Sequence, residues 1–150
     1  MPGRKFSPEL QDQVRQRANY LCEYCHTSEK WQYVQFTIDH VIPIKQGGSE
    51  SLENLALACF HCNRYKSNRQ AAIDPETQQM TDFFNPRNQA WANHFIWSAD
   101  KLTILGQSAT GRATIDVLKL NRERIQLIRE ADLAVNRHPP KDDPVIDRIS

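Results

Sequence analysis

The sequence predicts an α+β fold, because signals for helices and for short strands alternate along its 150 residues. A first helix is expected from Pro8, where Ser7 provides an N-cap and the proline suits the first helical position. Apolar residues then recur at helical spacing as far as Leu21. Two short apolar runs, 34–38 and 55–58, predict an antiparallel hairpin whose long loop contains a proline and two adjacent glycines.

A second helix is expected shortly after this hairpin, from Asn63 to about Asn68. The hairpin and the two helices make up a first region, 1–70, in which all the recognisable motifs lie. The remainder of the chain, 71–150, is predicted to be an accessory C-terminal region that contains a hairpin, a long helix and a loose tail.

Within the accessory region, two apolar runs at 94–97 and 102–105 flank a polar turn and predict the hairpin. Apolar residues that lie partly on one face predict a long helix from residue 114 to about residue 135. From His138 onward the chain is rich in proline and aspartate, which predicts a loose tail.

The composition, with 39% hydrophobic and 25% charged residues, is typical of a soluble globular protein with a modest core. No apolar run approaches the ~20 residues of a transmembrane helix, which argues against a membrane protein. The first residues are not followed by an apolar stretch of signal-peptide length, so a cytoplasmic location is expected. The net charge is only +1, so a nucleic-acid partner has to be argued from local motifs.

Four cysteines form two C-x-x-C pairs, Cys22 with Cys25 and Cys59 with Cys62. This spacing lets two sulfurs from one turn reach the same ion, and four thiolates complete the tetrahedral shell of a structural Zn²⁺. In a reducing cytoplasm such pairs are more often metal ligands than disulfides. Two pairs of buried free thiols, or a redox dithiol, are the less favoured interpretations.

Between the cysteine pairs, the dipeptide Asp39-His40 ends the first strand-like run. Neighbouring side chains of an extended chain point in opposite directions, so one can bind a metal while the other faces a substrate. Asn54 lies at the start of the returning run, close across the hairpin. Asn63 directly follows Cys62, so a zinc ion at the cysteines would determine its position.

The pattern C-x-x-C, D-H-V-I-P, G-G, N-L and C-x-x-C-N-x-x-K, from Cys22 to Lys66, resembles the zinc-knuckle form of the HNH endonuclease family. The resemblance implies a ββα-metal core that is treble-clef-like and contains a structural zinc site of four cysteines. The accessory region resembles an extension of small bacterial, often cyanobacterial, HNH proteins.

The resemblance also implies roles for the motif residues. His40 would be the general base that takes a proton from the attacking water, a task that suits an imidazole with an unperturbed pKa of about 6.5. Asp39 and Asn63 would hold the catalytic divalent ion, and their hard oxygen donors suit Mg²⁺ or Mn²⁺. Asn54 would brace the hairpin loop and so hold the base in place.

Lys66 matches the lysine of the family pattern and is expected to contact a DNA phosphate, as is Arg64 on the same helix. A solvated helix face is the alternative interpretation of both. Arg15 and Arg17, on outer faces of the first helix, are further candidates for phosphate contacts, although charges on a solvated face usually have no such role.

The expected activity is therefore metal-dependent hydrolysis of phosphodiester bonds in DNA, most often double-stranded DNA. A chain of this size either nicks one strand or cuts both as a homodimer. Restriction, repair, mobile-element homing and phage packaging are all compatible with this activity. A non-catalytic zinc-knuckle module that only binds nucleic acid is the alternative. Catalysis is favoured over it because Asp39, His40, Asn54 and Asn63 are all present.

Overall fold

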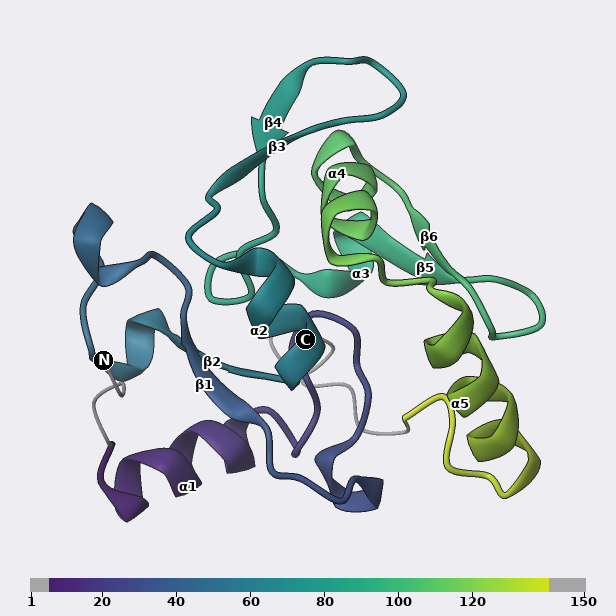
Figure 1. Cartoon of the computed structure of the whole chain (residues 1–150), viewed down its shortest axis with the longest axis horizontal. Helices are drawn as coiled ribbons and strands as arrows, with labels where there is room; N and C mark the ends of the chain where they lie inside the picture. Colours follow the sequence, from purple (N-terminus) through teal and green to yellow (C-terminus); the bar gives the residue numbers. More distant parts are fainter. Residues whose placement is uncertain (1–5, 141–150) are drawn as a thin grey trace.

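The computed structural model describes residues 6–140 and confirms the α+β fold class. Figure 1 shows the β1–β2 hairpin between helix α1 on one side and helix α2 on the other, with α4 and α5 beyond α2. The elements are α1 (Pro8–Arg17), β1 (Thr37–His40), β2 (Leu55–Ala58), α2 (Phe60–Lys66), β3 (Ala71–Ile73), β4 (Met80–Asp82), α3 (Trp91–His94), β5 (Phe95–Trp97), β6 (Ile104–Gly106), α4 (Ala109–Leu118) and α5 (Glu123–Ala134), with short 3-10 turns at Glu29–Trp31, Ile44–Gln46 and Leu52–Asn54.

Helix α1 begins as predicted, because the Ser7 hydroxyl accepts a hydrogen bond from the Leu10 amide at 3.2 Å. It ends at Arg17, before the predicted end at Leu21. Two successive residues, Asn19 and Tyr20, have positive φ angles of 53° and 61°, which turns the chain out of the helix. The helical spacing of the apolar residues therefore continues past the helix itself.

The predicted solvent-facing position of Arg15 and Arg17 is wrong. Arg15 is only 7% exposed and pairs with Glu29 at 3.1 Å, while its guanidinium also donates to the Phe36 carbonyl at 2.9 Å. Arg17 donates to the Leu52 carbonyl at 2.8 Å. Both arginines therefore fasten α1 to the segments around the hairpin, because this helix packs directly against β2.

The predicted antiparallel hairpin is confirmed, with Thr37 opposite Ala58 and His40 opposite Leu55. Strand β2 has the predicted bounds, and all its residues are buried. Strand β1 starts three residues later than predicted. The preceding segment uses side chains in place of a strand ladder, since the Phe36 amide donates to the Glu29 carboxylate at 2.6 Å.

Helix α2 starts at Phe60, three residues before the predicted start at Asn63, and ends at Lys66. The cause is the second cysteine pair: Cys59 is the N-cap, and its sulfur accepts a hydrogen bond from the Cys62 amide at 3.4 Å. The sulfur-capped turn is thus the first turn of the helix, and Asn63 lies on its surface immediately afterwards.

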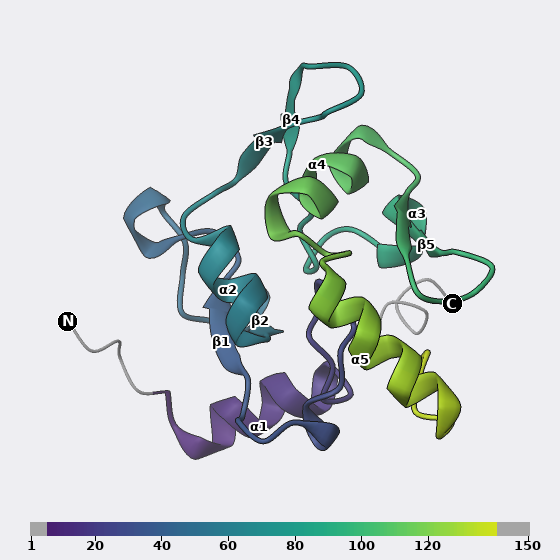
Figure 2. The ribbon, with the colours of Figure 1, turned by 45° about the vertical axis from the view of Figure 1, so that its right-hand side comes forward.

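In the accessory region the predicted hairpin is confirmed as β5–β6, with Phe95 opposite Gly106. A further hairpin, β3–β4, was not expected from the sequence. The turn that joins its strands is organised by the Asp74 carboxylate, which accepts hydrogen bonds from the Glu76 amide at 3.0 Å and the Thr77 hydroxyl at 2.9 Å. Figures 1 and 2 show this hairpin extending away from the rest of the fold.

The predicted single helix over 114–135 is wrong, because α4 and α5 are separate helices. Lys119 takes a left-handed conformation with φ 52° and ends α4. In the break, the Asn121 side chain bonds both the amide and the carbonyl of Ile104, at 2.7 and 2.8 Å. Tertiary hydrogen bonds to a neighbouring strand therefore hold the break between the two helices in place.

The two predicted regions contribute to one apolar core, and their division at residue 70 stays a prediction. Trp91 donates its indole N–H to the Tyr24 carbonyl at 3.0 Å, and Arg87 pairs with the buried Glu23 carboxylate. The accessory region thus closes over the first cysteine pair. The core includes Val14, Leu55, Leu57, Phe84, Trp91, Phe95, Leu118 and Leu120.

The predicted loose tail falls mostly on residues 141–150, which lie outside the described residues, as do residues 1–5. His138, where the predicted tail begins, is held in place: its ring lies 4.6 Å from that of Trp97 and its Nε2 is 2.7 Å from the Lys101 carbonyl. Between residues 6 and 140, no helix has the length and apolarity needed to cross a membrane.

Candidate functional site

The four cysteines converge on one buried point, where their sulfurs all lie within 4.8 Å of one another. A tetrahedral Zn²⁺ with Zn–S bonds of about 2.3 Å places its sulfurs about 3.8 Å apart. The sulfurs of Cys25 and Cys59 are 3.8 Å apart. Backbone amides support both turns, since Cys25 donates to Cys22 at 3.5 Å and Cys62 donates to Cys59 at 3.4 Å. The cluster therefore fits a zinc ion.

The four buried thiols affect one another's pKa values. Burial raises the pKa of the Cys22 thiol well above its ordinary value, whereas hydrogen bonds with the other three thiols lower the pKa of Cys25. Thiolates crowded into a low-dielectric interior need a positive charge, and a bound Zn²⁺ would supply it.

A groove of about 620 Å³ opens between the end of β1 and helix α2. Its walls bring together Asp39 and Asn63, the expected metal ligands, and His40, the expected general base. The other lining residues are Phe6, Ile38, Pro43, Ile44, Lys45, Ser67 and Asn68. Residues 24 positions apart in the sequence thus meet because the hairpin and α2 are joined through the cysteine cluster.

Asp39 is 5% exposed and is held by two side chains. The Tyr24 hydroxyl donates to Oδ2 at 2.9 Å, and the Lys66 ammonium lies 3.2 Å from Oδ2 and 3.4 Å from Oδ1. Burial raises the pKa of the Asp39 carboxyl, and the Lys66 charge and the Tyr24 hydrogen bond oppose that rise. The carboxylate is therefore fixed in direction at the wall of the groove.

His40 follows Asp39 on the strand and is less buried than its neighbour. Its ring centroid lies 5.6 Å from that of Phe6, and its Nε2 is 3.5 Å from a carboxylate oxygen of Glu50. Nε2 is shielded from solvent and makes no hydrogen bond to residues 6–140. The imidazole is thus placed between an aromatic ring and a carboxylate at the edge of the groove.

Asn54 spans the hairpin loop with its side-chain amide. Nδ2 donates to the Ile42 carbonyl at 2.9 Å and to the Ser49 carbonyl at 2.8 Å, and Oδ1 accepts from the Ile42 amide at 2.9 Å. The loop passes so closely that a Cβ on Gly48 would lie 1.7 Å from the Ile42 oxygen. Asn54 and Gly48 together therefore determine where the chain runs directly after His40.

Asn63 owes its position to the second cysteine pair, since its amide donates to the Cys59 carbonyl at 2.9 Å. Its side-chain amide lines the groove and makes no hydrogen bond within the described part of the chain. An amide oxygen in this situation is available to a cation or to a bound phosphate's water shell.

Lys66, expected to contact a phosphate, faces the protein interior. Its side chain is 1% exposed, and its ammonium donates to the His40 carbonyl at 3.1 Å in addition to its contacts with Asp39. Arg64, the other expected phosphate contact, is exposed on the outer surface of α2. The phosphate contact thus remains a proposal for Arg64, whereas the position of Lys66 indicates a different task.

Sequence reasoning missed two residues of this site, Tyr24 and Glu50. Tyr24 lies inside the first C-x-x-C pair and links the cysteine cluster directly to Asp39. Its position between two cysteines is the only signal that could have singled it out. Glu50 lies in the hairpin loop, where nothing in the sequence distinguishes it from an ordinary solvated carboxylate.

A four-cysteine cluster that joins a two-stranded hairpin to a short helix, with Asp39, His40 and Asn63 in one groove, defines the zinc-knuckle class of ββα-metal domains. The family model for the HNH endonuclease matches residues 22–69, the segment that contains both cysteine pairs and the groove residues Asp39, His40 and Asn63. A search of curated proteins and a search of solved structures each found no match. The match to the HNH family model associates the chain with nucleases and with nucleic acid.

Proposed function

We propose that the chain is a metal-dependent endonuclease that hydrolyses phosphodiester bonds in double-stranded DNA. The observation that carries the proposal is the convergence of Asp39, His40 and Asn63 on a single groove. Zinc at the four cysteines would hold the fold, while Mg²⁺ or Mn²⁺ would serve the reaction. Chelation of zinc is expected to unfold the domain, because a closed zinc site contributes directly to the free energy of folding.

The donor set suits a hard divalent ion. Asp39 offers a carboxylate oxygen and Asn63 an amide oxygen, both at the wall of the groove. Two protein oxygens leave most of the shell to water and phosphate, which is the usual arrangement for Mg²⁺. When bound, such an ion supplies positive charge to the scissile phosphate and to the leaving oxygen.

His40 is the general base of the proposed reaction. Because Nε2 is shielded from solvent beside Glu50, we assign proton acceptance to Nδ1, with the Nε2 proton directed at the Glu50 carboxylate. The imidazole takes a proton from the water that attacks phosphorus. The loop fastened by Asn54 keeps the backbone of His40 still during this step.

Arg64 is the proposed phosphate contact outside the groove. It is exposed on α2, the helix that also carries Asn63. A guanidinium there would attach to the DNA backbone and set the register of the strand without reading bases. The chain would nick one strand as a monomer, or cut both strands as a homodimer with two grooves.

The test is cleavage of supercoiled plasmid by the purified protein with Mg²⁺, Mn²⁺ or EDTA. We expect metal-dependent conversion to open-circular or linear DNA, and His40→Ala is expected to abolish it while zinc content and melting temperature stay unchanged. His138→Ala, which removes an imidazole outside the groove, is the matched control. A His40→Ala protein that cuts at the wild-type rate would refute the assigned base.

A non-catalytic module that only binds nucleic acid is the second candidate. It is favoured by one observation, the ion pair in which Lys66 already neutralises the Asp39 carboxylate without a metal. In that case the protein would retard the migration of DNA in a gel-shift assay and would leave plasmid intact with every metal.

A further inference from the structure

The Lys66 ammonium is a buried charge behind the groove wall, in contact with Asp39, that the proposed reaction does not use. A lysine head carries three donor protons. Here it lies 3.2 and 3.4 Å from the two oxygens of Asp39 and 3.1 Å from the His40 carbonyl. Its side chain is 1% exposed, so water does not compete for these protons. The cation is therefore committed to the candidate metal ligand.

The charges of the Asp39–Lys66 pair cancel. Asp39 contributes one negative charge and Lys66 one positive charge, Asn63 is neutral, and Lys45 is a further cation in the lining of the groove. Tyr24 stays a neutral phenol, because burial and the nearby Asp39 raise its pKa well above the ordinary value. A divalent ion that enters this groove thus meets the Asp39 carboxylate, whose negative charge is already paired with the buried Lys66 ammonium.

We propose that Lys66 is a positioning residue that acts as a resident competitor of the divalent ion. It holds Asp39 in place without metal, and it lowers the affinity for the metal alone, because its charge lies within a few ångströms of the shared ligand. The negative phosphate of DNA restores the missing charge, so metal and DNA bind with positive coupling. The phosphate part rests on the proposed function, whereas the effect on metal affinity depends only on Asp39 and Lys66.

The position of Tyr24 makes this inference testable, because it separates charge from hydrogen bonding. Tyr24 donates to the same Asp39 carboxylate, but it carries no charge. Removing Tyr24's hydroxyl loosens Asp39 and leaves the ammonium in place. Removing the ammonium leaves Asp39 with the Tyr24 hydrogen bond and access to the groove. The two changes should therefore move metal affinity in different directions.

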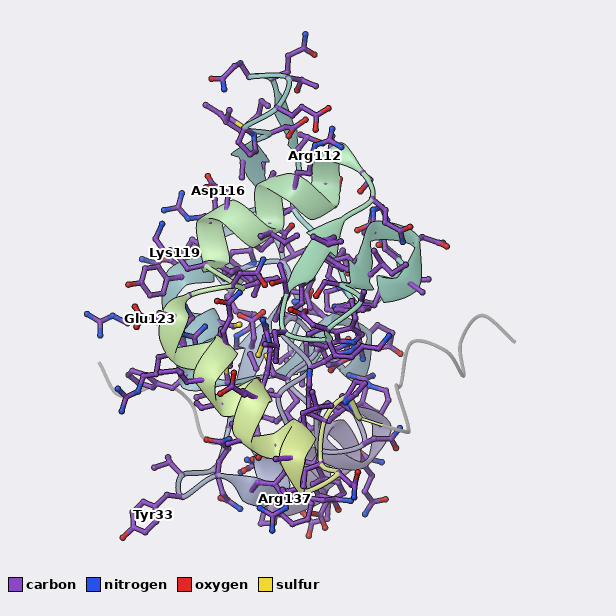
Figure 3. All side chains as sticks on the ribbon, turned by 90° about the vertical axis from the view of Figure 1, so that its right-hand side faces the viewer. Tyr33, Arg112, Asp116, Lys119, Glu123 and Arg137 are labelled. Carbon is purple, nitrogen blue, oxygen red and sulfur yellow. The ribbon has the colours of Figure 1, made fainter. Side chains whose placement is uncertain are left out.

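The experiment measures Mn²⁺ binding by electron paramagnetic resonance, on zinc-loaded protein without DNA. Lys66→Met and Lys66→Gln, both neutral, should bind Mn²⁺ about tenfold more tightly than wild type, since one adjacent positive charge is gone. Gln keeps a donor for Asp39, so it remains informative where Met fails to fold. Tyr24→Phe should not tighten binding, and Asp39→Asn should weaken it. Lys119→Met, at the exposed junction of α4 and α5 in Figure 3, is the matched control.

Folded Lys66 variants with wild-type or weaker Mn²⁺ affinity would overturn the inference. So would Tyr24→Phe that tightens binding equally, because release of Asp39 rather than loss of charge would then be the cause. The plasmid assay tests the nuclease separately: tighter Mn²⁺ binding in a protein that never cuts DNA supports the competitor and counts against the nuclease. Efficient cutting with unchanged Mn²⁺ affinity in both Lys66 variants supports the nuclease and refutes the competitor.

Discussion

Asn54→Ala is the substitution whose cost follows most directly from the structure. The side chain is 7% exposed and makes three hydrogen bonds to the loop, two with Ile42 and one with Ser49. Each bond is worth about 1 kcal/mol net, so the sum is about 3 kcal/mol. Water entering the half-open loop would satisfy part of what is lost, which lowers the expected destabilisation to about 2 kcal/mol.

For a chain of this length, about 2 kcal/mol corresponds to a fall in melting temperature of roughly 4–8 °C. The assay is thermal unfolding of zinc-loaded protein, followed by circular dichroism. Asn54→Asp is the matched variant: it keeps an acceptor for the Ile42 amide but loses both donors, so its melting temperature should lie at or below that of the alanine variant.

The Asn54→Ala variant should retain zinc, because Asn54 does not contact the cysteines. Its plasmid cleavage should fall by about tenfold or more, since a displacement near 1 Å at a positioned group is costly to catalysis. A melting temperature within about 1 °C of wild type would refute the reasoning, because the three loop bonds would then have no energetic weight.

Two further perturbations test the fold. Cys59→Ser should give a poorly folded, zinc-poor protein, because this cysteine is both a zinc ligand and the N-cap of α2; retained zinc with an unchanged melting temperature would contradict this. Arg112 holds the pKa of Asp74 well below its usual range through bonds of 2.9 and 3.0 Å, so this pair stabilises the fold above pH about 4 and loses that effect as acid protonates Asp74. Arg112→Gln should therefore lower the urea midpoint at pH 7 and flatten its decline towards pH 3, with Arg124→Gln as control; an unchanged pH profile would show that the pair has no such role.

The sequence alone predicted the parts of the site whose geometry is local. C-x-x-C spacing brings two sulfurs to one ion within a single turn, and the cysteines do meet. The Ser7 cap and the 55–58 strand were also predicted correctly, because capping and strand propensity depend on a few adjacent residues. Asp39 and His40 end strand β1, and Asn63 lies near the start of α2, directly after strand β2. They share one groove because the hairpin and the helix that follows it pack together.

The predictions that failed concern charges and breaks decided by distant partners. Between Leu118 and Ile125 the sequence has only a short polar run, which an exposed helix face would also explain, and the helix breaks where Asn121 bonds a strand. Arg15 looked solvent-facing until Glu29, 14 positions along the chain, was placed beside it. Charged side chains are long enough to reach inward, so their environment cannot be read from spacing alone.

Lys66 shows the same division within the site. Its sequence pattern identified it as a member of the motif, and the pattern favoured an outward contact with phosphate. Only the tertiary structure decided that its ammonium is buried against Asp39, 27 positions away. A buried charge needs an opposite charge nearby, and packing of α2 on β1 provides one. The sequence therefore determined which residues form the site, and the fold determined which of them face each other.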